Sequence, residues 1–156
     1  MPYPARIIAE WFLERAKRDG EFLTQMKLQK LVYIAHGWCL ALLNQPLLED
    51  DVEAWKWGPV IRSIYREFAI YGPDPIVWES PRSVAAKLDR TVLDVLERVW
   101  QVYKRYTASE LSSMTHQANT PWSEAYRQAD PPARISNDSI KSHYIALGRT
   151  RRNVSV

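Results

Sequence analysis

The chain has 156 residues, 46% of them apolar and 25% charged, with a net charge of +3, which is typical of one folded globular domain and excludes a disordered chain. Its one cysteine, Cys39, allows no internal disulfide, and residues 1–20 lack the apolar region of a signal peptide, so we expect a cytoplasmic protein. The longest apolar stretch, residues 31–43, is shorter than the roughly 20 residues of a membrane span, so we expect no membrane partner.

The first two predicted elements are helices. Apolar residues between positions 7 and 16 recur at helical spacing, and Asp19-Gly20 is expected to end this helix. Thr24 is the expected N-cap of a second helix over residues 26–44. Nearly every side of that helix carries apolar residues, so we predict that it is the central element of the core.

The segment EAWKWGPVIRSIYREF, residues 53–68, follows. Residues 52–55 alternate briefly, which predicts either a short strand or an extended connector. Gly58-Pro59 predicts the start of a third helix, because proline suits the first helical position. The buried face of this helix is expected to hold Val60, Ile61, Ile64, Tyr65 and Phe68.

A loop and two helices are expected next. Residues 71–81 contain three prolines and a glycine, which predicts a loop on the surface. Apolar spacing then predicts a long helix over residues 84–106. Thr107 and Glu110 have the spacing of a capping box and predict the start of a short helix that ends near residue 117.

The C-terminal part of the chain predicts two more helices. Thr120-Pro121 has the residues of a helix start, and the last helix is expected to begin near Asn137. The basic residues 149–156 are expected to form a flexible tail. We therefore predict a mainly α fold, with a single compact multi-helix domain over residues 1–148 and at most a short two-strand element.

The motifs give little support to catalytic or metal chemistry. His36 and Cys39 have a spacing that fits one face of a metal site, but a core thiol and a hydrogen-bonded imidazole are the favoured interpretation. His116 lies beside Ser112 and Ser113, as in a serine–histidine hydrolase, but no nucleophile-elbow glycines are present, and a role in a tight helix corner is favoured. We expect no enzyme, no catalytic residue, no metal and no cofactor.

The Trp55-Lys56-Trp57 segment is the candidate binding surface. In an extended segment both tryptophans share one side and Lys56 takes the other. Composition alone favours burial of both rings against the central helix. The alternative is that at least one ring anchors another protein, since Trp and Arg dominate interface hot spots. Our hypothesis for partner binding adds two outward arginines and a loop tryptophan to this segment: Trp55, Lys56, Trp57, Arg62, Arg66 and Trp78.

Three segments together are similar to one protein family. They are KLQKLVYIAHGWCLAL, EAWKWGPVIRSIYREFAIYG and LSSMTHQANTPWSEAY, in that order. The chain resembles the Panacea domain family, which includes SocA-like antitoxins and phage-associated GepA-like proteins, over most of residues 23–144. The recurring family positions, most of them expected to be structural, match Leu28, Gln29, Lys30, Leu31, Tyr33, Gly37, Trp55, Gly58, Pro59, Tyr65, His116 and Trp122 here.

The resemblance implies a helical antitoxin domain of a toxin–antitoxin system, encoded beside a toxin that it neutralises by direct protein–protein binding. An alternative, implied by the SocA branch, is a proteolytic adaptor that delivers the toxin to the ClpXP protease. A further alternative is a DNA-binding regulator that uses the basic residues Arg149, Arg151 and Arg152. Acidic and basic residues are interspersed elsewhere, so nucleic acid is not the expected partner. The resemblance does not identify the toxin.

Overall fold

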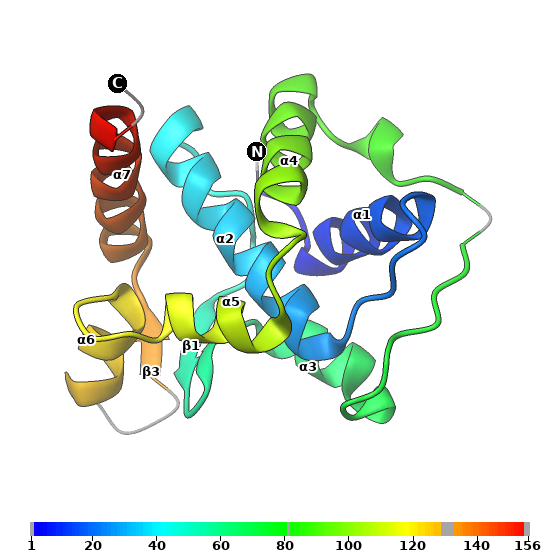
Figure 1. The fold of residues 1–156 in the computed structure, drawn as a ribbon, viewed down its shortest axis with the longest axis horizontal. Coiled ribbons are helices and arrows are strands. Elements are labelled where there is room, and N and C mark those ends of the chain that lie inside the picture. Colours follow the sequence, from blue (N-terminus) through cyan, green and yellow to red (C-terminus); the bar gives the residue numbers. More distant parts are fainter. Residues whose placement is uncertain (1, 81, 129–132, 155–156) are drawn as a thin grey trace.

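The computed structural model describes residues 2–80, 82–128 and 133–154. These residues form seven α-helices and a three-stranded sheet, which confirms the mainly α fold class (Figure 1). In chain order the elements are α1 (Ala5–Arg18), α2 (Gln25–Leu43), β1 (Val52–Trp55), β2 (Gly58–Val60), α3 (Arg62–Phe68), η1 (Ala69–Tyr71), η2 (Ala85–Lys87), α4 (Arg90–Tyr103), α5 (Ala108–Thr115), α6 (Pro121–Gln128), β3 (Ala133–Ile135) and α7 (Asn137–Val154).

α2 runs through the middle of the molecule, and α1, α4, α5 and α7 pack against it (Figure 1). Thr24 begins the helix as predicted, since its Oγ1 accepts a hydrogen bond from Lys27 N at 3.3 Å. Asn44 ends it in the left-handed conformation, with φ 55°. Every residue from 28 to 40 is buried, which confirms the central position predicted for this helix.

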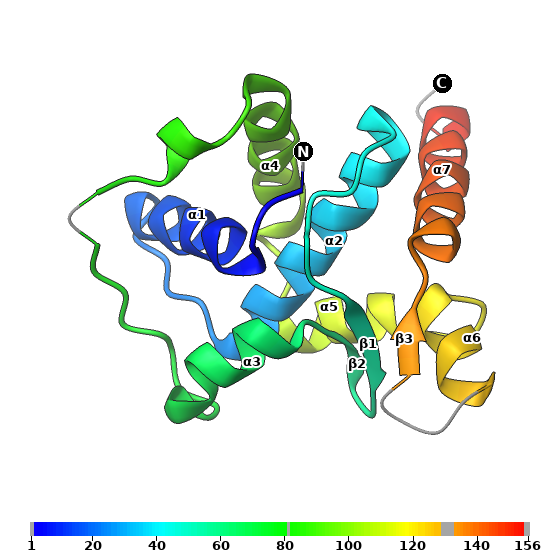
Figure 2. The same cartoon turned by 180° about the vertical axis from the view of Figure 1, so that it is seen from behind.

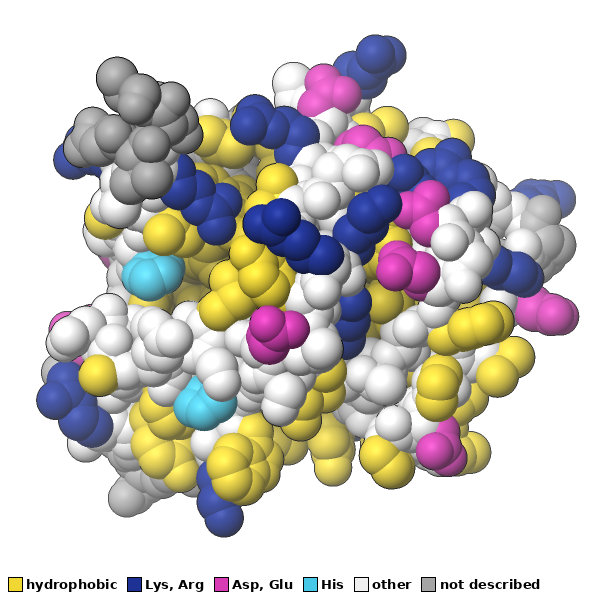
Figure 3. All heavy atoms as spheres, viewed as in Figure 1, with side chains coloured by type: hydrophobic (Ala, Val, Ile, Leu, Met, Phe, Trp, Pro, Cys, Tyr) yellow, Lys and Arg dark blue, Asp and Glu magenta, His cyan; other side chains and the backbone are white. Residues whose placement is uncertain are grey.

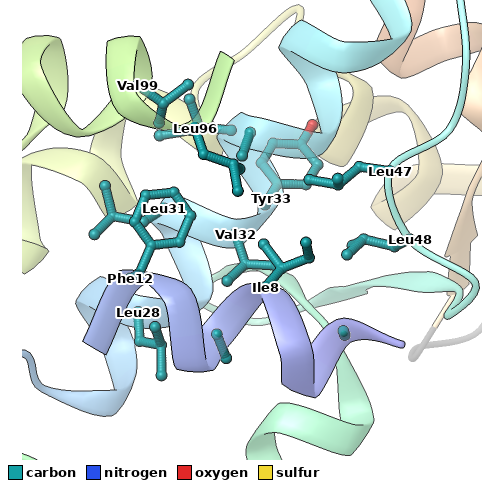
Figure 4. Close-up of a cluster of buried hydrophobic side chains, with 14 of the residues drawn as sticks. Ile8, Phe12, Leu28, Leu31, Val32, Tyr33, Leu47, Leu48, Leu96 and Val99 are labelled. Carbon is teal, nitrogen blue, oxygen red and sulfur yellow. The ribbon is translucent and has the colours of Figure 1, made fainter. Parts of the chain in front are cut away.

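The core lies where α1 and α4 meet α2. Figure 4 shows Phe12 and Ile8 of α1 on one side of α2 and Leu96 of α4 on another, all within one cluster of buried apolar side chains. Leu47, in the segment after α2, belongs to the same cluster. Each of these side chains contributes roughly 1.5–3 kcal/mol by leaving water. The hydrophobic effect therefore holds the framework that positions the surface elements.

The sheet has the strand order β2–β1–β3, and both pairings are antiparallel. It lies beside α6, as seen from behind the molecule (Figure 2). The sequence predicted at most two strands. β3 is missing from that prediction because three residues are too few to show an alternating pattern, and because its partner Val52 lies far away in the chain.

The third helix begins at Arg62, so the predicted start at Gly58-Pro59 is wrong. Gly58 has a φ of 121° and Gly58–Val60 pairs with β1 as strand β2. Of the residues predicted for the buried face of this helix, Ile64 and Phe68 are buried on α3, Val60 and Ile61 are buried before the helix begins, and Tyr65 is 42% exposed. Tyr65 lies on the flank of α3 that faces the β1–β2 hairpin, and its ring centre is 4.9 Å from that of Trp55.

The long helix predicted over residues 84–106 is shorter in the structure. Residues 85–87 form the 3-10 turn η2, Leu88 is extended, and α4 begins at Arg90. The capping box of α5 is confirmed: Thr107 Oγ1 accepts from Glu110 N at 3.1 Å, and the Glu110 carboxylate accepts from Thr107 N at 2.9 Å.

α7 continues past Gly148 to Val154, although the sequence predicted that the helix would end there. The Arg151 guanidinium explains the extra turn, because it lies 5.3 Å from the Trp38 ring centre and 5.4 Å from that of Tyr103. Residues 155–156 of the predicted tail lie outside the described residues. Within the described ranges, no helix combines the length and hydropathy needed to cross a membrane.

Candidate partner-binding site

β1 and β2 form a hairpin with Lys56-Trp57 as its two-residue turn, because Trp55 pairs with Gly58. The expectation that the segment is extended, with both tryptophans on one side, is therefore wrong. The Trp55 ring is half-buried, whereas the Trp57 side chain at the tip is 61% exposed. A large aromatic side chain thus projects from the end of a hairpin, with the Lys56 Nζ 5.0 Å from its ring centre.

Side chains from α2, α5 and α6 hold this hairpin by donating hydrogen bonds to its backbone carbonyls. Lys30 Nζ donates to Pro59 O at 3.0 Å, and Ser112 Oγ donates to Trp57 O at 2.8 Å. Trp122 Nε1 donates to Trp55 O at 2.6 Å. Three helices that are distant in sequence therefore fix the conformation of one short turn. A surface fixed in this way loses little conformational entropy when it binds a partner.

The end of β2 is held by a further pair of hydrogen bonds. The Gln29 carboxamide donates to Ile61 O at 3.0 Å and accepts from Ile61 N at 2.9 Å. Gly58 is required beside it, because a Cβ atom there would lie 3.0 Å from Lys30 Nζ and the residue has a positive φ. These recurring family positions therefore have a shared structural role, which is to hold the hairpin on α2.

Other recurring family positions belong to the core. Leu28, Leu31 and Tyr33 are fully buried on α2. Gly37 allows the close approach of α7, whose Tyr144 ring occupies the space that a Cβ atom would need. Among the recurring family positions, Tyr65 differs from these in being 42% exposed.

Lys30 is a buried cation, with 2% of its surface exposed. Pro59 O is its hydrogen-bond acceptor, and no carboxylate of the described residues lies within salt-bridge distance. Burial disfavours the charged ammonium and lowers the pKa of Lys30 to about 8. At neutral pH the hairpin therefore packs on a positive charge that no carboxylate of the described residues neutralises.

This burial predicts a distinctive dependence of stability on pH. The folded-state pKa of Lys30 lies below the ordinary value of 10.5, so the unfolded chain binds more protons between these values and stability rises with pH. We expect the free energy of unfolding of the wild type to rise by about 2 kcal/mol relative to Lys30→Met between about pH 8 and pH 10. Urea unfolding of both proteins measures this difference, and parallel pH profiles would contradict it.

The outer face of the hairpin carries an ion pair. Arg62 Nη2 lies 2.9 Å from Glu53 Oε1, and the Trp55 indole N–H donates to the same oxygen at 2.8 Å. The Arg62 guanidinium also lies 5.6 Å from the Trp55 ring centre. Arg66 is exposed one turn further along α3. Of the two candidate arginines, Arg66 is therefore the more available to a partner.

A groove of about 430 Å³ opens beside the hairpin tip. The exposed side chains of Met26, Trp57 and Tyr65 line it together with buried Lys30 and Val60, and we call it the hairpin groove. No acidic residue of the described chain lines this groove. Its chemistry is therefore apolar and basic.

Of the six proposed binding residues, Trp55, Lys56 and Trp57 line the hairpin groove, whereas Arg62 and Arg66 lie outside it on α3 and Trp78 packs elsewhere. The half-buried Trp78 ring packs edge-on against Phe68, with the ring centres 6.1 Å apart, and it does not line the hairpin groove. Two residues of this surface were not predicted from the sequence: Met26, which lines the groove, and Ser112, which holds the hairpin. Neither has a local signal, since each joins the hairpin only through the packing of α2 and α5.

The residues considered for chemistry have structural partners. His36 Nδ1 accepts from the backbone N–H groups of Leu47 and Leu48, and its Nε2 donates to Asn137 Oδ1 at 2.9 Å. Burial lowers the pKa of His36 and raises the pKa of Cys39 to about 12. Within the part of the chain described, no three metal-ligating side chains converge.

His116 lies in the helix corner that the sequence predicted. Its Nδ1 is 3.3 Å from Ser112 Oγ, and its ring packs edge-on against Trp122 at 5.4 Å. The Ser112 hydroxyl donates to Trp57 O, so its proton holds the hairpin. His116 therefore supports the two side chains that fix the turn.

Comparison with known proteins identifies the family. The sequence model of the family described as "Antitoxin SocA-like, Panacea domain" matches residues 28–123. The chain is 32% identical over 127 residues to "Antitoxin SocA" of Caulobacter vibrioides (strain NA1000 / CB15N), covering 76% of this chain and 68% of that protein. No solved structure matches the chain. The family match includes the hairpin and the side chains that hold it, and the chain belongs to the SocA-like antitoxin family with the Panacea domain.

Proposed function

We propose that this chain is an antitoxin that neutralises a cognate toxin by direct protein–protein contact, and that the hairpin tip, the hairpin groove and the neighbouring Arg62 and Arg66 of α3 form the contact surface. Family membership supports the antitoxin role. The single observation that carries the choice of surface is Trp57, whose exposed indole projects from a turn with a backbone held by side chains of three helices. Fixed, partly apolar tryptophans are the commonest hot spots of protein interfaces.

The chemistry of the surface defines the toxin segment that fits it. Trp57, Tyr65 and Met26 offer apolar area, and Lys30 and Lys56 supply positive charge at the same groove. A toxin segment with an apolar side chain beside a carboxylate satisfies both features. Such a carboxylate would give Lys30 an ion-pair partner, which strengthens association because a buried charge gains most from a partner in a desolvated site.

Rescue of growth tests this proposal. The open reading frame beside this gene is expressed with and without the wild-type chain, and we expect growth arrest that the chain relieves. Replacing Arg62 and Arg66 together by glutamate is expected to abolish rescue, while helical content and Tm stay nearly unchanged. The single variant Arg66→Glu separates the effect of surface charge from loss of the Arg62–Glu53 ion pair. Rescue that survives these charge reversals would remove this surface from the proposal.

Arg90→Glu is the matched control, because Arg90 is an exposed arginine at the start of α4 that belongs to neither the hairpin nor α3. It is expected to rescue growth like the wild type.

Delivery to ClpXP, the alternative mechanism, makes a different prediction for toxin levels. Direct neutralisation leaves a silent toxin complex in cells with or without ClpXP, whereas delivery removes the toxin only where ClpXP is active.

A further inference from the structure

A second groove lies at the other end of α2, between α4 and α7. It has a volume of about 520 Å³, and its lining shares no residue with the hairpin groove. Figure 1 shows α7 and α4 on either side of the C-terminal half of α2. Figure 3, in the same view, shows apolar side chains in the hollow between these helices, with Lys and Arg side chains around it. We call it the α4–α7 groove.

The groove exposes apolar side chains that the core does not cover. Leu42 of α2 is 51% exposed and Val102 of α4 is 37% exposed. Val95 and Val99 lie on the same face of α4 as Val102, so the apolar stripe of α4 continues from the core into the groove. Exposed apolar surface within a groove marks a site of interaction, and a groove flanked by two helices fits a third helix.

The charged side chains that line the groove are both arginines. The Arg151 guanidinium is held over Trp38 and Tyr103, and its Nη2 donates to the Tyr103 hydroxyl at 2.9 Å. Arg98 is exposed on α4 opposite, and within the described residues no carboxylate lies within salt-bridge distance of it. No acidic residue of the described chain lines the groove. Arg98 therefore favours a negatively charged occupant.

We propose that the α4–α7 groove binds an acidic amphipathic helix of a partner protein. The apolar face of that helix packs against Leu42 and Val102, and its carboxylates pair with Arg98. This goes beyond the proposed toxin contact, because the two grooves share no lining residue. One chain can then hold two partners at once, or two segments of one partner.

A designed peptide tests the proposal with the full chain. The probe is a labelled peptide of about 15 residues, long enough to form a helix, with leucine on one face and glutamate on the other. A matched peptide carries lysine in place of glutamate. Fluorescence anisotropy is expected to show that the acidic peptide binds at least about tenfold more tightly, and that added salt weakens its binding.

Two groove variants and one external control locate the peptide. Arg98→Glu and Leu42→Asp are each expected to weaken binding of the acidic peptide by about tenfold or more, since each removes a different contact. Trp57→Ala is expected to bind the acidic peptide like the wild type. This variant therefore separates a failure of the α4–α7 groove proposal from a failure of the proposed toxin contact. Both groove positions are exposed, and unchanged thermal unfolding checks that the variants fold.

Four results would overturn the proposal. The first is no binding of the acidic peptide, the second is equal binding of the lysine peptide, and the third is full binding by Arg98→Glu. The fourth is a dimer of the wild-type chain in analytical ultracentrifugation that Leu42→Asp dissociates, since the groove would then be covered by a second copy of this chain.

Discussion

Trp57→Ala is expected to weaken binding of the toxin by roughly 2–4 kcal/mol, the range of an interface hot spot. The loss is large because the Trp57 side chain projects from a turn that three helices hold, so binding gains its apolar area at little entropic cost. The Tm is expected to stay within a few degrees of the wild type, since an exposed side chain adds little to folding. Titration calorimetry with the product of the adjacent gene measures the affinity.

Ile70→Ala is the matched control for Trp57→Ala. Ile70 is the most exposed large apolar residue of the described chain, and it does not line the hairpin groove. We expect its affinity for the toxin to equal that of the wild type. The contact surface would be wrong if Trp57→Ala bound the toxin with full affinity, or if Ile70→Ala lost as much.

Gly37→Ala is expected to lower the free energy of unfolding by about 3 kcal/mol, the upper part of the range for an overpacked core. An added Cβ would lie 2.3 Å from Tyr144 Cδ2. The Tyr144 ring cannot move aside easily, because it packs against Tyr33 and Trp38 with ring centres 6.2 and 5.2 Å away. The clash separates α7 from α2 and outweighs the roughly 1 kcal/mol that alanine adds to helix propensity. Urea unfolding measures the loss.

Gly148→Ala is the control on α7. A Cβ atom at Gly148 would lie 3.5 Å from Trp38 Cζ3, an ordinary contact, so this variant is expected to be as stable as the wild type or slightly more stable. Adding Tyr144→Ala to Gly37→Ala removes the clashing ring and is expected to cost less than the sum of the two single losses. A Gly37→Ala protein with wild-type stability would contradict the account of α2–α7 packing.

Local signals predicted much of the fold. The Thr24 cap, the apolar surround of α2 and the Thr107–Glu110 capping box all act within a few residues, and all three are confirmed. The helix predicted from Gly58-Pro59 is wrong because the same residues also suit the strand after a tight turn. Pairing with β1 decides between these two conformations, and the sequence pattern does not include that pairing.

The candidate site was predictable only in part. The sequence singled out Trp57 by its residue type, but its exposure depends on the two-residue turn at Lys56-Trp57. The hydrogen bonds from Ser112 and Trp122 join segments more than 50 residues away, at sequence separations of 55 and 67, so no local pattern contains them. Residue type and a loop position predict Trp78 as a binding residue, but its ring packs on Phe68 and does not line the groove.

Growth and complex formation in cells that lack ClpXP test the central claim most directly. The product of the adjacent gene is expressed with this chain, and the two proteins are then purified together through a tag on this chain. Direct neutralisation predicts restored growth and recovery of an intact complex with the wild type, and loss of both with Trp57→Ala. Persistent growth arrest without ClpXP, or restored growth without a complex, would contradict it.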